Sequence, residues 1–328
     1  MGWQAFPGEW HLSAAVLLLA LVFDCMLGEP PDVLHPVVWM GKLIALLERL
    51  FPMGGNATSL LAGAGIALFV PALFGLAAWL AVQGLRELGT IPYLLGGALL
   101  LKTTFSVKGL GQAAQVTRRF LVAGNLNAAR RSLGRLVSRD TQKLDEPLVA
   151  AAAIESVGEN TTDSYIAPWL AFALLGLPGA FAYRAVNTLD SMIGYHGKYE
   201  YSGKAAAKLD DLVNLVPARL SALLLLAAGL FAGLSQRVAE PLEAVSVRRG
   251  WKIMRRDHGL TESPNAGWTM SAMSGLIGVA LEKPGHYLIG NGLRRPGAAD
   301  IGRAVRLAYL TAALGVLTTL CLLVMSGK

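Results

Sequence analysis

Three stretches of this chain are apolar over the length needed to cross a lipid bilayer: residues 60–82, 212–234 and 304–325. A transmembrane helix needs about 20 consecutive residues that are mostly apolar. Shorter apolar stretches cover residues 12–23, 93–105 and 165–183. We therefore predict an all-α, polytopic integral membrane protein with about five hydrophobic helices, within a range of roughly four to seven.

A seventh apolar stretch, residues 270–281, is too short to span and is expected to be buried or re-entrant. No Lys or Arg precedes Lys42, so we interpret residues 12–23 as a retained helix rather than a signal peptide. We find no internal repeat and no low-complexity linker. The simplest prediction is one membrane-embedded domain over residues 1–328.

The composition agrees with a bilayer as partner, because only 16% of the residues are charged, against about a quarter in soluble domains. The formal net charge is +7. Basic cytoplasmic loops and attraction to anionic lipid both explain such a charge. Nucleic-acid binding would need a basic face with motif support, which we do not find, so no nucleic-acid partner is predicted. Cys25 and Cys321 are expected to be small buried apolar residues, without a disulfide or thiolate metal site.

Most of the positive charge lies in two polar segments, residues 102–146 and 236–258. Cytoplasmic loops of membrane proteins are enriched in Lys and Arg. We therefore predict a polar helical cytoplasmic insertion at residues 106–163 and a second basic cytoplasmic segment at residues 235–269.

Counting spans would place residues 184–211, which are rich in polar motifs, on the opposite side from both basic segments. Gly176, Pro178 and Gly179 interrupt the apolar stretch before them, and Pro217 interrupts the one after. Broken helices are tolerated at membrane depth where they line a cavity. We predict that residues 165–183 are bent or re-entrant and that 184–211 form a loop lining a cavity on the same side as residues 118–143.

The first polar cluster is ESVGENTTDS, residues 155–164. On a helix, Glu155, Glu159 and Asp163 share one face, and like charges at that spacing repel. The repulsion costs more near a membrane unless a cation relieves it. With Asn160 beside them, these carboxylates suit a magnesium site that also uses substrate phosphates. The alternative is a solvated acidic helix face or a capped helix start.

The second cluster is YRAVNTLDSMIGY, residues 183–195. On a helix, Arg184 shares a face with Thr188, and Asn187 shares one with Asp190 and Ser191. The arginine could simply extend its side chain to the membrane interface. That alternative does not explain Asn187 and Asp190, so we interpret the set as functional.

The third cluster is LDDLVNLVPARL, residues 209–220, with Asp210, Asp211 and Asn214 in one turn and Arg219 after the proline. Paired acids often only stabilise a helix start. The functional interpretation is a second carboxylate group for a metal or an amine.

The fourth cluster is SPNAGW, residues 263–268, a predicted turn that could aim Ser263, Asn265 and backbone N–H groups at an anion. A plain surface turn is equally compatible. His35, in the proline-rich connector LGEPPDVLHPV, is expected to be structural. The chain has no Gly-x-x-x-x-Gly-Lys-Ser/Thr sequence, so a nucleotide site would not be of the P-loop type.

Taken in order, these blocks resemble the adenosylcobinamide-phosphate synthases, the CobD/CbiB family of cobalamin biosynthesis. The resemblance covers nearly the whole chain. It is carried by LGEPP with HPV near the start, SRDT, LDEP, ESVGENTTDS, YRAVNTLDSMIGY, AKLDDLVNLVPARL and SPNAGW. The chain departs from the expected pattern at Gly158, where we expect Ala, and at HGKYEYSG, which replaces a more charged version.

The resemblance implies a multi-pass protein of the inner cell membrane that joins aminopropanol phosphate to a propionate carboxylate of adenosylcobyric acid. The implied cofactors are ATP and Mg²⁺, and other membrane enzymes of the corrinoid pathway are candidate partners. A carboxylate must be activated before it forms an amide in water, and we infer an acyl phosphate. Two other classes stay open: a transporter, which also uses broken helices, and a non-catalytic membrane regulator or sensor.

The clusters supply the candidate roles for such a reaction, which needs charge around a transferring phosphoryl group and a base for the amine. The candidate catalytic residues are Glu155, Glu159, Asp190 and Asp211. The candidate metal ligands are Glu155, Glu159, Asp163 and Asp210. The candidate substrate- and phosphate-binding residues are Arg184, Asn187, Arg219, Asn160, Asn214, Ser263 and Asn265, with Lys198, Lys204 and Lys208 as alternatives.

Overall fold

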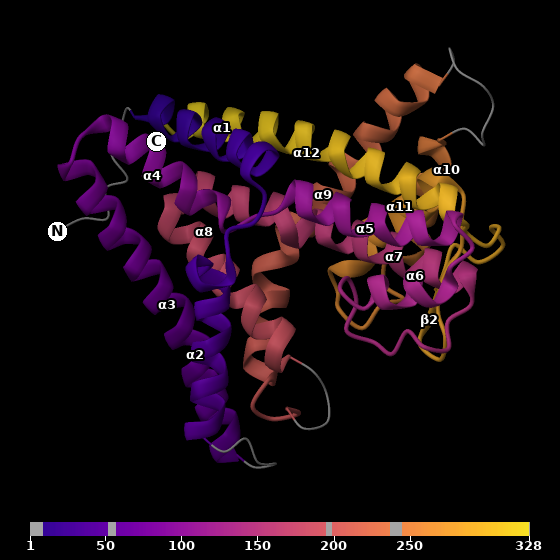
Figure 1. Cartoon of the computed structure of the whole chain (residues 1–328), viewed down its shortest axis with the longest axis horizontal. Coiled ribbons are helices and arrows are strands. Elements are labelled where there is room, and N and C mark those ends of the chain that lie inside the picture. The colour runs from indigo at the N-terminus through magenta and orange to yellow at the C-terminus, as the bar shows by residue number, and fades with distance from the viewer. Residues whose placement is uncertain (1–8, 52–56, 195–198, 237–244, 328) are drawn as a thin grey trace. The chain divides into compact units, whose positions relative to one another are not determined.

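The computed structural model describes residues 9–51, 57–194, 199–236 and 245–327. These residues are almost entirely helical (Figure 1). The helices are α1 Trp10–Leu27, α2 Pro36–Leu50, α3 Ala57–Glu87, α4 Thr90–Lys102, α5 Val107–Val122, α6 Leu126–Leu133, α7 Glu146–Thr161, α8 Ala167–Ile193, α9 Lys204–Gln236, α10 Val247–Asp257, α11 Ala266–Ile277 and α12 Ala298–Ser326. A 3-10 turn, Asp32–Leu34, precedes α2, and a π-helical turn, Thr162–Ile166, joins α7 to α8. An antiparallel hairpin pairs β1 Leu281–Lys283 with β2 Tyr287–Ile289.

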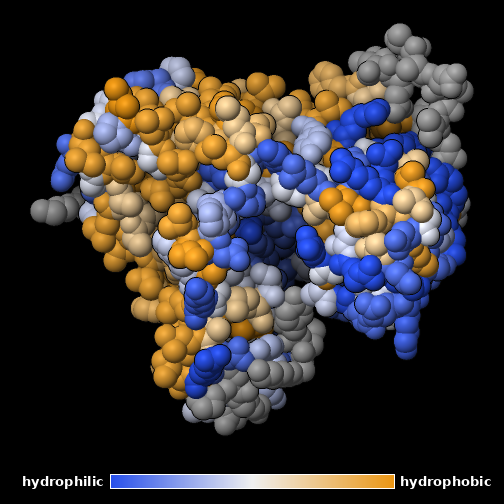
Figure 2. Space-filling model, viewed as in Figure 1, coloured by the Kyte–Doolittle hydropathy of each residue, from blue (hydrophilic) through white to orange (hydrophobic). Residues whose placement is uncertain are grey.

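Six segments of the described chain are long and apolar enough to cross a membrane. They are Trp10–Leu27, Thr58–Glu87, Thr90–Val122, Glu146–Ile193, Lys204–Gly233 and Ala298–Ser326. Each contains all or nearly all of one of the six apolar stretches recognised in the sequence, so the prediction of a polytopic all-α membrane protein is confirmed. The seventh stretch begins in α11, where residues 267–277 except half-buried Trp268 are buried. Exposed leucines such as Leu61, Leu68 and Leu80 cover α3, which shows a hydrophobic surface in Figure 2.

The chain divides into two compact units. The first contains residues 1–106, 167–214 and 316–328, and the second contains residues 107–166 and 215–315. In the first unit α3 packs on α8, and α1 packs on α4. Small residues allow these apolar helices to approach closely. A Cβ on Gly75 would lie 3.4 Å from the Pro178 carbonyl oxygen, and one on Gly97 would lie 3.4 Å from Val16.

An ion-paired cluster joins the end of α4 to the end of α1 in the first unit. The Lys102 ammonium lies 3.2 Å from Asp24 and 2.8 Å from Glu29, and the side chains of Lys102 and Asp24 are almost fully buried. Glu29 also accepts from the Ser106 hydroxyl at 2.5 Å. His35 Nδ1 accepts from the Val37 N–H, so its Nε2 faces Glu29 as the N–H donor. His35 therefore caps α2 and orients Glu29, which is the structural role expected from the sequence.

The cluster predicts a pH dependence of stability. Burial alone would raise the pKa of Glu29, but hydrogen bonds from His35, Lys102 and Ser106 outweigh it and lower the pKa from 4.5 to about 2. A carboxylate with a depressed pKa in the folded state stabilises the protein above its unfolded pKa. We expect that contribution to be lost as the pH falls from about 4.5 to about 2. Melting temperatures of the detergent-solubilised protein and of Glu29→Gln should test this. Parallel pH profiles for the two proteins would contradict it.

The interruption predicted in the apolar stretch before residue 184 is present. Gly176 has φ 67° and ψ −160°, a backbone conformation outside the helical region, and it separates two helical parts of α8. Glycine reaches positive φ without a Cβ clash, and Pro178 cannot donate a helical hydrogen bond. The predicted bend is therefore confirmed, whereas the side of the membrane on which residues 184–211 lie stays a prediction.

Three other expectations were wrong. Pro217 does not interrupt its helix, because α9 continues through it. Residues 184–193 and 204–211 are helical rather than a loop. In the former, Thr188 and Ser191 donate to carbonyl oxygens one turn earlier, which is compatible with helix. Cys25 and Cys321 are exposed on α1 and α12 rather than buried. An apolar helix surface that meets lipid accommodates a small thiol as readily as a core does.

In the second unit α7 forms the centre of the core. Its residues 149–158 are all buried, and it packs against α5, α6, α11 and β1. A run of four alanines, residues 150–153, lets neighbouring helices approach from several sides. Gly158, the departure from the family pattern, continues this surface, because a Cβ there would lie 3.3 Å from the Met270 Cα of α11. The core of this unit thus holds α7, and the carboxylates near its end, in a fixed position.

Candidate functional site

Glu155 is a buried carboxylate in the otherwise apolar core of the second unit. Its Oε2 accepts from Arg139 Nη2 at 2.8 Å, and the two side chains are 6% and 19% exposed. Within the described residues its Oε1 is buried and has no hydrogen-bond partner. A buried acceptor without a partner is rare in folded proteins and calls for an explanation such as a ligand or an ion. Arg139 therefore holds one oxygen of Glu155, and the other has no hydrogen bond of good geometry, although the Tyr287 hydroxyl lies near the carboxylate.

The β1–β2 hairpin adds two groups that sequence reasoning missed. Lys283 and Tyr287 are cross-strand partners, with the Lys283 Nζ 5.8 Å from the centre of the Tyr287 ring. Both lie close enough to interact electrostatically with Glu155. Burial, together with the charges of Glu155 and Glu159, raises the pKa of Tyr287 above its usual value. Tyr287 therefore stays a hydroxyl donor, and Lys283 adds a cation near the carboxylate.

No periodic signal in the sequence marks these residues. The hairpin is only three residues long on each strand, so its alternation is too brief to recognise. Arg139 lies in the SRDT motif, but we counted it only as one cation of a basic segment. The turn at Pro284 and Gly285 was the one available indication that Lys283 and Tyr287 face each other.

The other members of the first cluster differ in their surroundings. Glu159 is exposed and interacts electrostatically with Glu155, whereas Asp163 is half-buried in the π-helical turn. Asn160 is engaged within the chain: its amide donates to Ser156 O at 2.9 Å, and its oxygen accepts from the Ser164 hydroxyl at 3.1 Å. That these carboxylates share a cavity with Asp210 or Asp211 stays a prediction.

A second set of predicted residues meets at the start of α11 in the same unit. Arg219 Nη1 donates to Asn265 Oδ1 at 2.6 Å and to Leu215 O at 2.9 Å. Its guanidinium lies 5.0 Å from the Trp268 ring centre, and His258 lies against the same ring. The Ser263 hydroxyl accepts from the Asn265 N–H at 3.2 Å, which closes the SPNAGW turn. The structure thus brings Arg219, Ser263 and Asn265 together.

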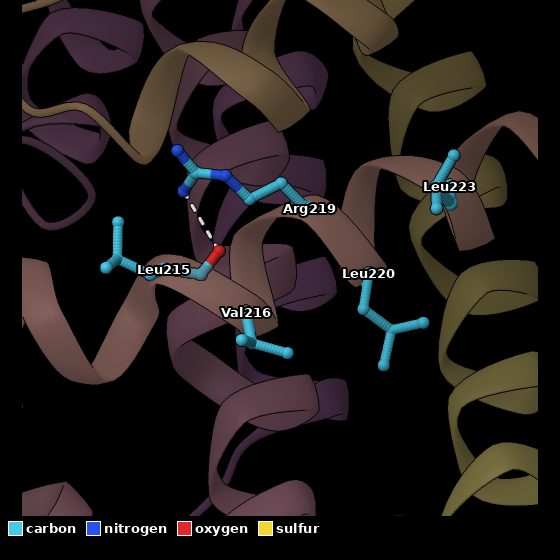
Figure 3. A pocket seen from close by; sticks show the side chains of 5 residues that line it. All are labelled: Leu215, Val216, Arg219, Leu220 and Leu223. Carbon is cyan, nitrogen blue, oxygen red and sulfur yellow. Dashed lines mark hydrogen bonds between the residues drawn. The ribbon is translucent and has the colours of Figure 1, made fainter.

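Arg219 also borders an apolar depression of about 500 Å³ on α9. Figure 3 shows its guanidinium turned back toward the Leu215 carbonyl and away from Leu223. Burial and the nearby charge of Arg219 lower the pKa of His258. His258 is therefore biased toward the neutral form, which leaves Arg219 as the cation of this turn.

In the first unit a chain of hydrogen bonds joins the second and third clusters. The Tyr183 hydroxyl donates to Asn214 Oδ1, and Asn214 Nδ2 donates to Asp210 Oδ2, each at 2.9 Å. Asn187 lies near Asp210, and Arg184 Nη1 donates to Asn187 Oδ1 at 3.3 Å. These contacts hold α8 and α9 together through polar side chains that come from two separate sequence blocks.

Two further carboxylates surround this network. Asp190 and Asp211 interact electrostatically with Asp210 and with each other. Like charges this close are costly in a membrane protein unless a cation or a proton compensates them. Lys204 and Lys208 are exposed in the first turns of α9, whereas Lys198 lies outside the described residues.

The residues that could hold Mg²⁺ occur as small carboxylate groups. Within the described residues no group of three or more His, Cys, Asp or Glu side chains is arranged to hold a metal by itself. Magnesium usually keeps several waters and binds through one or two carboxylates plus substrate phosphates. The oxygen donors of Asp190 with Asp210, or of Glu155 with Glu159, fit that mode of binding.

Arg184 provides a test of phosphate binding. Arginine forms two parallel bonds to phosphate, whereas lysine acts as a point charge. If Arg184 binds a substrate phosphate, Arg184→Lys should lower kcat/KM about tenfold or more, which corresponds to about 1.4 kcal/mol. The exposed Arg49 of α2 provides a matched control, Arg49→Lys, which should leave steady-state kinetics unchanged. Unchanged kinetics in Arg184→Lys would mean that this arginine only reaches for the membrane interface.

Comparison with known proteins gives a consistent result. The model of the family described as "CobD/Cbib protein" matches residues 17–316. The chain is 45% identical over 279 residues to the "Cobalamin biosynthesis protein CobD" of Dehalococcoides mccartyi, covering 85% of this chain and 87% of that protein. It is 39% identical over 307 residues to the "Probable cobalamin biosynthesis protein CobD" of Methanothermobacter thermautotrophicus, covering 91% of this chain and 94% of that protein. A protein of the same description from Pyrococcus furiosus is 39% identical over 296 residues, covering 90% and 93%. No solved structure matches the chain significantly.

Proposed function

This chain belongs to the CobD/CbiB family of cobalamin biosynthesis, and from that premise we propose that it is an ATP-dependent ligase. Its reaction joins aminopropanol phosphate to a propionate carboxylate of adenosylcobyric acid through an amide bond. The family assigns the chain to cobalamin biosynthesis as a multi-pass membrane enzyme that acts on corrinoids. The substrates, the nucleotide and the inner cell membrane as location are part of the proposal.

The observation that carries the proposal is the buried Glu155, one oxygen of which is held by Arg139 while the other has no hydrogen bond of good geometry among the described residues. An amine attacks only after it has lost a proton, and a carboxylate held close to it can accept that proton. Arg139 fixes the orientation of Glu155 through its other oxygen, at 2.8 Å. Lys283 and Arg139 provide positive charge near Glu155, and a phosphoryl group would need such charge.

The ligation proceeds in two chemical steps. First, a propionate oxygen attacks the γ-phosphorus of ATP; the bond from that phosphorus to the bridging oxygen breaks, and ADP leaves. The amine nitrogen then attacks the acyl carbon, the acyl carbon–oxygen bond breaks, and inorganic phosphate leaves with the former propionate oxygen. The proton of the amine passes to the base, for which Glu155 is our candidate. Magnesium, when bound, would neutralise charge on the phosphoryl group.

The network in the first unit supports binding of a charged substrate. Aminopropanol phosphate carries an ammonium and a phosphate. Asp190, Asp210 and Asp211 offer negative charge to an ammonium or to Mg²⁺, and Arg184 offers a cation to a phosphate. Asn214 holds Asp210 in place by a hydrogen bond.

A transporter is the second candidate, because Gly176 breaks α8 and broken helices are typical of transporter binding sites. One experiment separates the two. Purified protein is incubated with ATP, Mg²⁺, adenosylcobyric acid and aminopropanol phosphate, and the corrinoid is analysed by mass spectrometry. Ligation predicts a corrinoid heavier by aminopropanol phosphate minus water, with ATP consumed. An unchanged corrinoid, together with its uptake into proteoliposomes, would favour the transporter.

A further inference from the structure

The amphipathic helix α10 has one face that no part of the described chain covers. Its residues Gly250, Ile253, Met254 and Asp257 are buried, and the helix packs against α11. Gly250 and Gly275 face each other at that contact: a Cβ on Gly275 would lie 2.7 Å from the Gly250 Cα. The orientation of α10 in the second unit is therefore fixed, and the opposite face is exposed.

The exposed face is basic and carries a tryptophan. Four exposed residues form this face: Arg248, Trp251, Lys252 and Arg255. Their spacings of three, one and three residues place them on one side of the helix. Arg256 is adjacent but is paired with Asp257. Within the described residues, Arg248, Lys252 and Arg255 have no ion-pair partner. This face, here called the α10 basic face, thus presents three uncompensated cations.

The start of α10 lies beside the end of a candidate membrane span. The span in α9 ends at Gly233. A Cβ on Gly229 would lie 3.4 Å from Val247 of α10, and one on Gly233 would lie 3.7 Å from the Val245 carbonyl oxygen. A helix in contact with the last turns of a span is at the height where the bilayer meets water.

We propose that the α10 basic face binds the headgroups of anionic phospholipids at the membrane surface. Basic amphipathic helices with tryptophan lie at such interfaces, and tryptophan is enriched at headgroup level. Anionic lipids complement the three cations and attract each Lys or Arg near the surface. The binding anchors α10 and, through its contact with α11, the turn that holds Asn265 and Arg219. The proposal is independent of the reaction that the protein catalyses.

The test uses the full-length protein in nanodiscs. In a variant without Cys25 and Cys321, Trp251→Cys carries an environment-sensitive fluorophore. The discs contain phosphatidylcholine with a small fraction of nitroxide-labelled phosphatidylglycerol or of nitroxide-labelled phosphatidylcholine. We expect the phosphatidylglycerol quencher to be the stronger at low salt and its advantage to fall at high salt. Each cation raises the affinity for the anionic lipid about fivefold. Replacing all three cations should therefore remove most of the difference in quenching between the two lipids.

Two sets of variants make the result specific. The combined variant Arg248→Gln, Lys252→Gln and Arg255→Gln should lose most of the preference for the phosphatidylglycerol quencher, whereas Arg248→Lys with Arg255→Lys should keep it. The control replaces three exposed cations elsewhere in the unit, Arg131, Arg135 and Lys143, by Gln and should also keep it. Equal quenching by the two lipids, or quenching by neither, would overturn the proposal. An equal loss in the control would also overturn it, because net charge rather than this face would then be responsible.

Discussion

Replacing Glu155 by Gln is expected to lower the rate of amide formation by about 100-fold or more while the protein still inserts and folds. The amide keeps the shape of the side chain but cannot accept a proton. Glu159→Gln is expected to abolish turnover as well, because Glu159 is the nearest second carboxylate on α7. Rates are measured by mass spectrometry of the corrinoid, and insertion by gel filtration of the solubilised protein.

The matched control is Glu146→Gln, which removes an exposed glutamate from the first turn of the same helix and should keep wild-type turnover. Wild-type activity in Glu155→Gln would show that Glu155 is not the base of the reaction. Wild-type activity in Glu159→Gln would show that Glu159 is not a metal ligand required for turnover. A loss in Glu146→Gln of the same size as in Glu155→Gln would show that the effect reflects helix stability.

The largest expected effect on stability comes from Lys102→Met. Asp24, 2% exposed, would be left in an apolar surrounding without its cation. Removing one partner of a buried ion pair costs about 3–5 kcal/mol, because the remaining charge is uncompensated. The free energy of unfolding is measured by titration with denaturing detergent.

A double variant separates the ion pair from simple packing. Lys102→Met combined with Asp24→Asn should recover a large part of the lost stability, because neither charge then remains buried. Lys42→Met, which changes an exposed lysine of α2, is the control and should have little effect. If the double variant is less stable than Lys102→Met alone, the pair does not act as described.

Hydrophobicity along the chain was sufficient to locate the apolar stretches of the six candidate spans, although about five spans were predicted, because each stretch is a local property of about 20 residues. The break in α8 was equally local, since Gly176 and Pro178 carry it in their own backbone preferences. Pro217 shows the limit of that reasoning. A proline within the helical region removes one hydrogen bond, but α9 continues through Pro217.

The sites were predictable in part. Helical spacing identified the polar clusters, but it could not show that Asn214 would reach Tyr183, or that Arg139 would pair with Glu155. Such pairs depend on how helices distant in sequence pack, which a single sequence does not reveal. Lys283 and Tyr287 were missed for the same reason: only the fold of the second unit brings the hairpin to α7.

The most direct test of the central claim, that a carboxylate is activated by phosphoryl transfer, follows one oxygen atom. Adenosylcobyric acid is labelled with ¹⁸O in the reacting propionate and incubated with the protein, ATP, Mg²⁺ and aminopropanol phosphate. An acyl phosphate intermediate predicts one ¹⁸O in inorganic phosphate for each amide formed, because the acyl carbon–oxygen bond breaks when the amine attacks. Amide formation with ¹⁸O in AMP, or with no ¹⁸O in any phosphate, would contradict the acyl phosphate, and no amide at all would contradict the ligase.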